Sequence, residues 1–247
     1  MLSLSSSLLL VISDKSRYFP QIRQIVEKNN DVDRKVLWST LERLVKKGFI
    51  KKSKKEKGTE FSLTSLGKKY LPHEPEVISR PKRAWDNKWR MVIFDIPETK
   101  RKIRTELYER LKKYGFGRMQ NSVYITPHDC LDDAKKIIKE LKITDKVKVM
   151  LVENLYVEDL PKMAENVWHI SDLNKKYQIF VKKYQSAPKK FDFSPEILKY
   201  WLTITKFEYL SIVHDDPVLP KELLPLNWTG YKAQEVWDSL EKILQTY

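Results

Sequence analysis

Hydrophobic positions in the first part of the chain repeat with the spacing of short helices. Apolar residues cluster around residues 4–12 and again around residues 20–29, which predicts two helices there. Further on, Leu37, Leu41 and Leu44 follow one another at i, i+4 and i+7, the spacing of one helix face. A third helix is therefore expected, with a narrow buried stripe of leucines.

The predicted third helix has start and stop signals and a polar face opposite its leucines. Asp33 is a suitable N-cap and Gly48 a suitable residue after the C-terminus, so the helix should run from about residue 34 to 47. At about 100° per residue, the face opposite the leucines carries basic and hydroxyl side chains, and also Glu42. The candidates on this helix for contact with DNA are Lys35, Ser39, Thr40, Arg43 and Lys46.

A lysine-rich stretch follows between two segments that favour β-structure. Residues 49–50 and 61–63 flank it, and Gly58 lies within it, so we predict a hairpin with a charged turn. Three helices followed by a basic hairpin is the order of the winged helix-turn-helix, whose third helix enters the major groove while the wing lies along phosphates. The lysines of the predicted wing are Lys51, Lys52, Lys54, Lys55 and Lys57.

Two interpretations of these charges stay open from the residues alone. A charged helix face is usually only solvated, and Glu42 suits a DNA-facing position only if it accepts a hydrogen bond from a cytosine amino group. Several lysines on one loop, however, repel one another unless a counter-charge arrives. The lysine run therefore favours double-stranded DNA as a partner.

The middle of the chain, residues 88–157, alternates between strand and helix patterns. An apolar run at residues 91–94 ends in Asp95, and a basic helix, two short strands, a second helix capped by Asp129 and a last strand follow. Strand, helix, strand, strand, helix, strand is the ferredoxin-like order. The three later strands are expected at residues 118–120, 122–126 and 147–152.

The last part of the chain carries helical patterns. One long helix is expected first, from an apolar stripe formed by Met163, Val167, Ile170, Tyr177, Val181 and Tyr184. A second helix should begin with Ser194 as its cap and Pro195 at its first position. After a proline-rich crossing, a final helix should run from about residue 231 to 246.

These patterns together predict an α+β chain of several domains. The expected divisions are a winged helix-turn-helix domain at residues 1–71, a linker at 72–87, a ferredoxin-like domain at 88–157 and a helical domain at 158–247.

Charge and cysteine content narrow the class of partner. The net charge is +14, and residues 1–71 hold 16 basic and 7 acidic side chains, so the positive charge is concentrated where the DNA reader is expected. Cys130 is the single cysteine, which excludes an internal disulfide and favours a reducing compartment. The opening residues lack the basic region of a signal peptide, and no stretch approaches the about 18 apolar residues of a membrane span. A cytoplasmic protein without a membrane partner is expected.

Two motifs carry a family resemblance that covers nearly the whole chain. The stretch VIFDIPETKRKIR, continued by GF and QNSVYITP, resembles the small dimeric protein of CRISPR spacer acquisition and also the middle domain of PaaX-type transcriptional repressors. The later stretch DPVLPKELLPLNWTGYKA, residues 216–233, is similar to the C-terminal signature of PaaX repressors. The front domain and this signature favour the PaaX-type repressor.

The resemblance implies a dimeric, sequence-specific repressor that a small molecule releases from DNA. PaaX repressors respond to an aromatic acyl-CoA, so a similar effector is implied here. A homodimer is also expected, because two wings need a fixed separation to read a palindrome. No cofactor is implied by this reading.

Asp95 supports an alternative reading as a divalent-metal-dependent endonuclease. In the CRISPR relatives the matching aspartate is the proposed ligand of a divalent ion, paired with its mate across the dimer axis, where two carboxylates could hold Mg²⁺ and activate a water. The competing explanation is structural: the Asp95 carboxylate accepts hydrogen bonds from backbone N–H groups at the turn, near the positive end of the next helix. The sequence has no zinc-type histidine spacing, glycine-rich phosphate loop or serine-nucleophile motif. An architectural DNA-binding protein without an effector is a third possibility.

Overall fold

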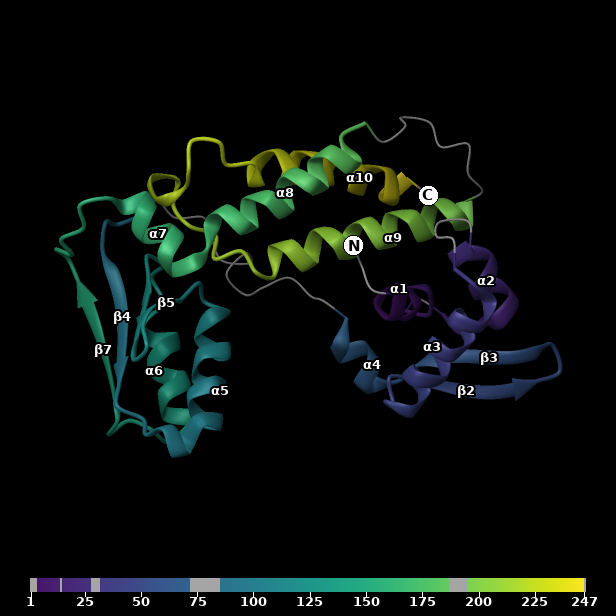
Figure 1. Ribbon diagram of the computed structural model, residues 1–247, viewed down its shortest axis with the longest axis horizontal. Helices are drawn as coiled ribbons and strands as arrows, with labels where there is room; N and C mark the ends of the chain where they lie inside the picture. The colour runs from purple at the N-terminus through teal and green to yellow at the C-terminus, as the bar shows by residue number, and fades with distance from the viewer. Residues whose placement is uncertain (1–3, 14, 28–31, 72–84, 187–194, 247) are drawn as a thin grey trace. The chain divides into compact units, whose positions relative to one another are not determined.

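The computed structural model combines helices with two antiparallel sheets, which confirms the α+β class (Figure 1). The structure describes residues 4–13, 15–27, 32–71, 85–186 and 195–246. The chain forms two compact units, and each is assembled from separate stretches. Unit 1 comprises Met1–His73, Phe180–Ser211 and Lys232–Tyr247, and unit 2 comprises Glu74–Ile179 and Ile212–Tyr231. The domain boundaries after residues 71, 87 and 157 stay predictions, and most of the expected linker, residues 72–84, lies outside the described residues.

The N-terminal part of unit 1 contains the three predicted helices. In the third, the Asp33 carboxylate accepts from the Lys35 backbone N–H at 2.7 Å, and the three leucines of the stripe are buried, as predicted. The second helix was expected to reach residue 29, which lies outside the described residues. The elements are α1 (Leu4–Val11), β1 (Arg17–Tyr18), α2 (Phe19–Glu27), α3 (Arg34–Lys46), β2 (Ile50–Lys55), β3 (Gly58–Leu63) and α4 (Ser65–Tyr70).

The hairpin corrects the prediction that its lysines lie in a turn. The strand β2 continues through Lys55, and only Glu56 and Lys57 separate it from β3. Lysine is somewhat depleted in strands, but strand propensity depends on context, and here β2 pairs with β3 along its whole length. The two-residue strand β1 pairs with β3 on its other side, so β3 is the central strand of the sheet, in the order β1-β3-β2. Neither β1 nor α4 was predicted.

The C-terminal helices contribute an aromatic core to unit 1. Tyr184 meets Trp201 edge to face at 5.6 Å, and Tyr209 stacks on Trp237 at 5.5 Å, both measured between ring centroids. These contacts join α8 (Ile170–Tyr184), α9 (Pro195–Val213) and α10 (Gly230–Thr246). The expected cap of α9, Ser194, lies outside the described residues. No described helix is long and apolar enough to span a bilayer.

Unit 2 is built on a four-stranded antiparallel sheet in the order β5-β6-β4-β7, with α5 and α6 on one face (Figure 1). Val92 and Phe94 of the central strand β4 pack against Leu107 and Leu111 of α5 in the core under that face. The order of elements is the one that the sequence predicts. They are β4 (Trp89–Phe94), the 3-10 turn η1 (Glu98–Lys100), α5 (Arg101–Lys112), β5 (Gly117–Gln120), β6 (Val123–Thr126), α6 (Leu131–Glu140) and β7 (Val147–Val152).

The opposite face of the sheet is covered in part by α7 (Leu160–Trp168). Met163, Ala164 and Val167 of this helix lie in one core with Trp89 and Ile125. The segment after α9 adds the 3-10 turn η2 (Lys221–Leu223) to the same core.

The long helix predicted near the C-terminus is two helices, so that prediction was wrong. The break is His169, whose backbone is left-handed with φ 53° and ψ 50°, and whose N–H donates to the Glu165 carbonyl at 2.9 Å. Neither glycine nor proline marks the break, and the apolar stripe continues across it. The six predicted stripe residues are all buried, three in α7 and α8 before Tyr177 and three from Tyr177 onward.

Asp129 was predicted to cap α6, and this was also wrong. Cys130 occupies the N-cap position without a side-chain hydrogen bond, and an Asp129 carboxylate oxygen lies 3.1 Å from a guanidinium nitrogen of Arg90. Arg90 is only 4% exposed, and a buried guanidinium needs carboxylate partners. Asp129 therefore pairs with Arg90 and does not cap α6.

The Arg90 guanidinium is held mainly by Asp86, just before β4. Its Nη1 and Nη2 donate to the two carboxylate oxygens of Asp86 at 2.7 and 2.6 Å. The hydrogen bond from Arg90 lowers the pKa of Asp86 below its ordinary value of 3.8, although burial acts in the opposite direction. A lowered carboxylate pKa contributes stability above the ordinary pKa, and that stability is lost as the pH falls through the folded-state value.

We predict that Asp86→Asn lowers the free energy of unfolding at pH 7 by about 1–2 kcal/mol, less than for a fully buried pair because Asp86 is partly exposed and Asp129 remains. Urea unfolding at pH 7 and pH 3 measures this, and the gap between wild type and variant should shrink at pH 3, because below the ordinary pKa of 3.8 the unfolded chain takes up a proton at Asp86. Asp132→Asn, at a carboxylate that is 96% exposed, is the matched control and should change little. A gap that persists undiminished at pH 3 would contradict the ion-pair account.

Candidate nucleic-acid interface

The exposed face of α3 carries most of the residues that the sequence predicts there. Lys35, Ser39 and Lys46 are exposed on one side of the helix, opposite the buried leucines. The Ser39 hydroxyl donates to the Val36 carbonyl at 3.0 Å, so its oxygen can still accept a hydrogen bond. Val36 itself is 50% exposed, and sequence reasoning missed it. Its signal was an apolar residue outside the leucine stripe, a type of side chain that can contact a thymine methyl group.

Thr40 does not belong to this surface, which corrects the prediction. Its side chain is 5% exposed, and its hydroxyl donates to the Val36 carbonyl within the helix at 2.8 Å. It lies three residues after Leu37 and four before Leu44, and therefore on the edge of the buried stripe.

Arg43 is exposed but engaged in a contact within unit 1. Its Nη2 donates to Ser5 Oγ of α1 at 3.0 Å. A guanidinium has five N–H donors, so one bond to a serine leaves the others available. Arg43 therefore ties α3 to α1 and still presents donors at the edge of the exposed face.

The lysines of β2 are divided between the two faces of the hairpin. Lys52 lies directly opposite Phe61 in the ladder, on the side that faces α3. There it forms an ion pair with Glu42, and its Nζ lies 4.8 Å from the ring centroid of Trp38. Lys51 and Lys55, at odd positions, project from the other face. Lys52 is thus a contact between hairpin and helix.

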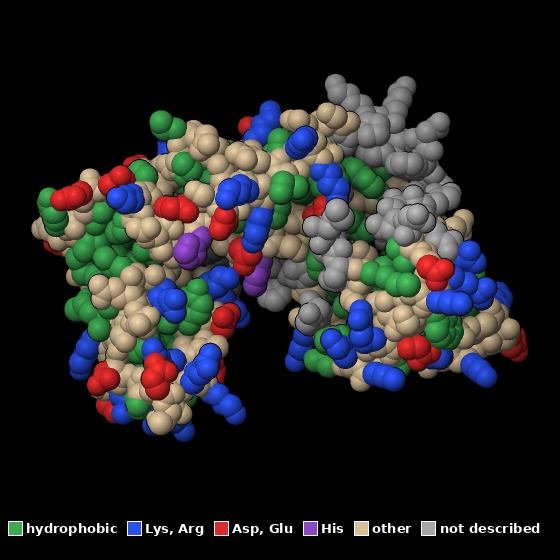
Figure 2. Space-filling view, in the orientation of Figure 1, with side chains coloured by type: hydrophobic (Ala, Val, Ile, Leu, Met, Phe, Trp, Pro, Cys, Tyr) green, Lys and Arg blue, Asp and Glu red, His purple; other side chains and the backbone are tan. Residues whose placement is uncertain are grey.

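The remaining hairpin lysines are exposed and, among the residues that the structure describes, have no carboxylate partner. Opposite Lys51, Lys54 and Lys55 in the ladder stand uncharged residues of β3, so no like charges face one another directly. Figure 2 shows Lys and Arg side chains gathered over the hairpin and α3. We call the exposed set the α3–hairpin surface: Lys35, Val36, Ser39, Arg43, Lys46, Lys51, Lys54, Lys55 and Lys57.

Asp95 lies directly after β4, far along the chain from the α3–hairpin surface. Its side chain is exposed, and its backbone N–H donates to the Lys146 carbonyl at 2.9 Å. Within the described part of the chain, no group of three or more histidines, cysteines or carboxylates could hold a metal ion. Asp95 is therefore not part of such a group among the described residues.

Two families of known proteins match the part of the chain that follows the α3–hairpin surface in sequence. The family described as the PaaX protein central Cas2-like domain matches residues 82–164. The family described as the PaaX-like protein C-terminal domain matches residues 168–247. The chain belongs to the PaaX family.

A curated member of the PaaX family and a solved structure extend the comparison. The chain is 24% identical over 207 residues to the transcriptional repressor PaaX of Escherichia coli (strain K12), a match that covers 80% of this chain and 65% of that protein. The chain also resembles the structure of an uncharacterized protein of Mycobacterium tuberculosis, with a TM-score of 0.57 and 18% identity, over 99% of this chain and 97% of that one. The second likeness concerns the fold.

Membership of the PaaX family does not by itself assign the residues of the α3–hairpin surface. Both family matches begin after it, at residues 82 and 168. Its assignment depends on exposure and charge in the structure of this chain.

We predict that Lys52→Met lowers the free energy of unfolding by about 0.5–1 kcal/mol, because it removes an ion pair and a cation–π contact at a partly exposed position. The matched control Lys51→Met, one residue away on the other face, should be neutral. Chemical denaturation measures the stability, and the indole N–H resonance of Trp38 should shift in Lys52→Met only. Equal effects of the two substitutions would contradict the assignment of Lys52 to the joint between hairpin and helix.

Proposed function

We propose that this PaaX-family protein is a DNA-binding transcriptional regulator, a repressor that reads duplex DNA with the α3–hairpin surface. One observation carries the proposal: the hairpin has exposed lysines with no carboxylate partner among the described residues, and it packs beside a helix with one exposed polar face and one buried side. An anion with closely spaced charges, such as a DNA backbone, suits this pattern. The repressor named among its relatives supports the same conclusion.

The proposed geometry is that of a winged helix-turn-helix. In it α3 lies in the major groove with Lys35, Ser39 and Val36 toward base edges, and the hairpin lies along the backbone with Lys51 and Lys55 on phosphates. Contacts to phosphates position the protein, and contacts to base edges provide the specificity.

A homodimer and a small-molecule effector belong to the same proposal. Two copies would place two α3 helices on the halves of a palindrome, with the ferredoxin-like sheet of unit 2 as a scaffold. Binding of the effector would release the repressor from its DNA. An acyl-CoA as that effector stays a prediction from the family resemblance.

An endonuclease that uses Asp95 is the alternative, and similarity to a transcriptional repressor favours a regulator without enzymatic activity. A bound Mg²⁺ would be needed for the alternative only. The two functions differ in what they do to DNA, so they can be separated directly.

We predict that Lys51→Ala with Lys55→Ala weakens binding to operator and random DNA alike. Each lost phosphate contact should reduce the slope of log K against log salt by about 0.9, so the pair should reduce it by about 2. Fluorescence anisotropy between low and moderate salt gives the slope. Lys135→Ala with Lys139→Ala, on the exposed side of α6, is the matched control of equal charge. A slope that the hairpin pair leaves unchanged would remove the hairpin from the interface.

We predict that the purified protein does not cleave duplex DNA in the presence of Mg²⁺ or Mn²⁺, and that Asp95→Ala binds DNA as the wild type does. Gel analysis of supercoiled and linear substrates measures cleavage, and anisotropy measures binding. Metal-dependent cleavage that disappears in Asp95→Ala would establish the endonuclease reading instead.

A further inference from the structure

Val36 is an apolar side chain on the polar face of α3. It is 50% exposed and stands between Lys35 and the buried Leu37 in the first turn of the helix. Among the described residues before residue 72, one other large apolar side chain is exposed, Leu66 of α4 at 52%. Valine is also a weaker helix former than alanine, because its branched side chain is restricted about χ1. Neither core packing nor helix propensity therefore accounts for a valine at this position, whereas contact with an external apolar group does.

Ser39 places a hydrogen-bond acceptor beside this apolar group. It lies three residues after Val36, on the same side of the helix and about 5–6 Å away between Cβ atoms. Its hydroxyl donates to the Val36 carbonyl at 3.0 Å. The single hydroxyl proton is used in that bond, so toward an external ligand the Ser39 oxygen is an acceptor. Val36 and Ser39 thus offer a pair of methyl groups next to an acceptor oxygen.

The other side-chain acceptors of α3 are already engaged. Glu42 forms an ion pair with Lys52 of the hairpin. Thr40 is buried, and its hydroxyl donates to the Val36 carbonyl at 2.8 Å. Ser39 is therefore the acceptor that α3 can present to a ligand without giving up a buried position or an ion pair.

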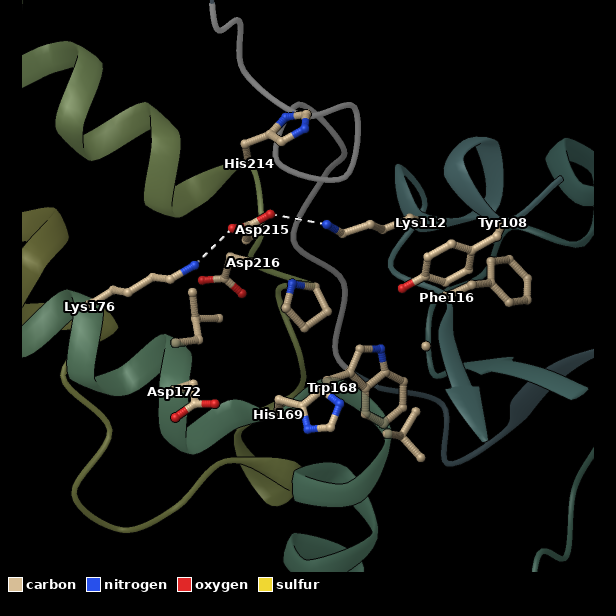
Figure 3. Close-up of a pocket in the computed structure, with 14 residues that line it drawn as sticks. Tyr108, Lys112, Phe116, Trp168, His169, Asp172, Lys176, His214, Asp215 and Asp216 are labelled. Carbon is tan, nitrogen blue, oxygen red and sulfur yellow. Dashed lines mark hydrogen bonds and ion pairs between the residues drawn. The ribbon is translucent and has the colours of Figure 1, made fainter. Parts of the chain in front are cut away.

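Lys35 adds a cation to the same turn of the helix. Its backbone N–H donates to the Asp33 carboxylate at 2.7 Å, which fixes the start of α3, and its ammonium group has no carboxylate partner among the described residues. Lysines of unit 2 differ in this respect: Lys112 and Lys176 lie 3.0 and 2.9 Å from the two carboxylate oxygens of Asp215 (Figure 3). Lys35 can therefore meet an acceptor on DNA without breaking an ion pair.

We infer that Val36 and Ser39 read a thymine·adenine base pair in each half-site of the operator, an inference that rests on the proposed function. In the major groove, the edge of this pair carries the C5-methyl group of thymine and the N6 amino group of adenine. Val36 covers the methyl group, and the Ser39 oxygen accepts a hydrogen bond from the amino group. A guanine·cytosine pair has no methyl group and loses the first contact. Lys35 supplies affinity beside this pair.

Duplexes recovered with the full chain from a random library provide the probe for Val36. Each thymine of the recovered sequence is replaced in turn by deoxyuridine, which pairs with adenine in the same way and lacks only the methyl group. We expect one position per half-site at which the replacement weakens binding about fourfold, the value for one buried methyl group. At that position Val36→Ala should bind the thymine and uracil duplexes with equal affinity, as measured by fluorescence anisotropy.

Two controls separate the methyl contact from a general loss of binding. Lys35→Ala should weaken binding to both duplexes by the same factor and so keep the ratio between them. Leu66→Ala removes the other exposed apolar side chain and should change neither affinity. Alanine suits an exposed helix position, and circular dichroism checks that each variant is folded. A preference for thymine that persists in folded Val36→Ala, or equal wild-type affinities for both duplexes at every thymine, would overturn the inference.

The amino contact has a probe of its own. Replacing the paired adenine by 2-aminopurine keeps two hydrogen bonds to thymine but moves the amino group to the minor groove. This should weaken binding of the wild type severalfold and leave binding of Ser39→Ala unchanged, and equal losses in the two proteins would overturn the role of Ser39. A library from which no sequence is enriched would refute the proposed function and the inference with it. Enrichment without a thymine that Val36 distinguishes from uracil would refute the inference alone.

Discussion

The proposed DNA-binding surface of this protein depends on Trp38, the side chain at which the hairpin meets α3. Its ring meets Phe19 edge to face at 4.8 Å and Phe61 at 5.9 Å between centroids, and Lys52 lies over it. Aromatic pairs of this geometry contribute about 0.5–1.5 kcal/mol beyond the burial of their area. Because Phe61 belongs to the central strand of the small sheet, the contact fixes the hairpin against the helix. The exposed lysines and the polar helix face are thereby held at fixed positions relative to each other.

Cations in buried or partly buried positions differ in their partners from those on the hairpin. In unit 2 the buried Arg90 and the lysines at Asp215 have carboxylate partners at hydrogen-bond distance. On the hairpin, Lys51 and Lys55 are exposed without such partners among the described residues. A buried charge requires a partner of opposite charge. An exposed lysine is stabilised by water, and a polyanion can replace that water. The exposed hairpin lysines therefore form the surface at which the proposed function places an external anion.

Local signals in the sequence predicted the local structure well. The leucine stripe and the Asp33 cap gave α3 because a helix is specified by neighbours along the chain. Thr40 and His169 were misjudged, the first because it lies at the edge of a stripe, the second because a left-handed break needs no glycine or proline when packing enforces it. The ion pairs of Asp215 could not be predicted, since the lysines come from α5 and α8, and only the folded chain brings them together. The PaaX resemblance was confirmed by the family matches.

The central claim, that the α3–hairpin surface makes this PaaX-family protein a regulator of particular promoters, is tested most directly by a genome-wide map of the DNA that the full chain occupies. The account predicts a small number of occupied sites in promoters, each with two inverted half-sites whose spacing is constant. Occupancy scattered over the genome without a shared inverted repeat, or no enrichment above background, would contradict it.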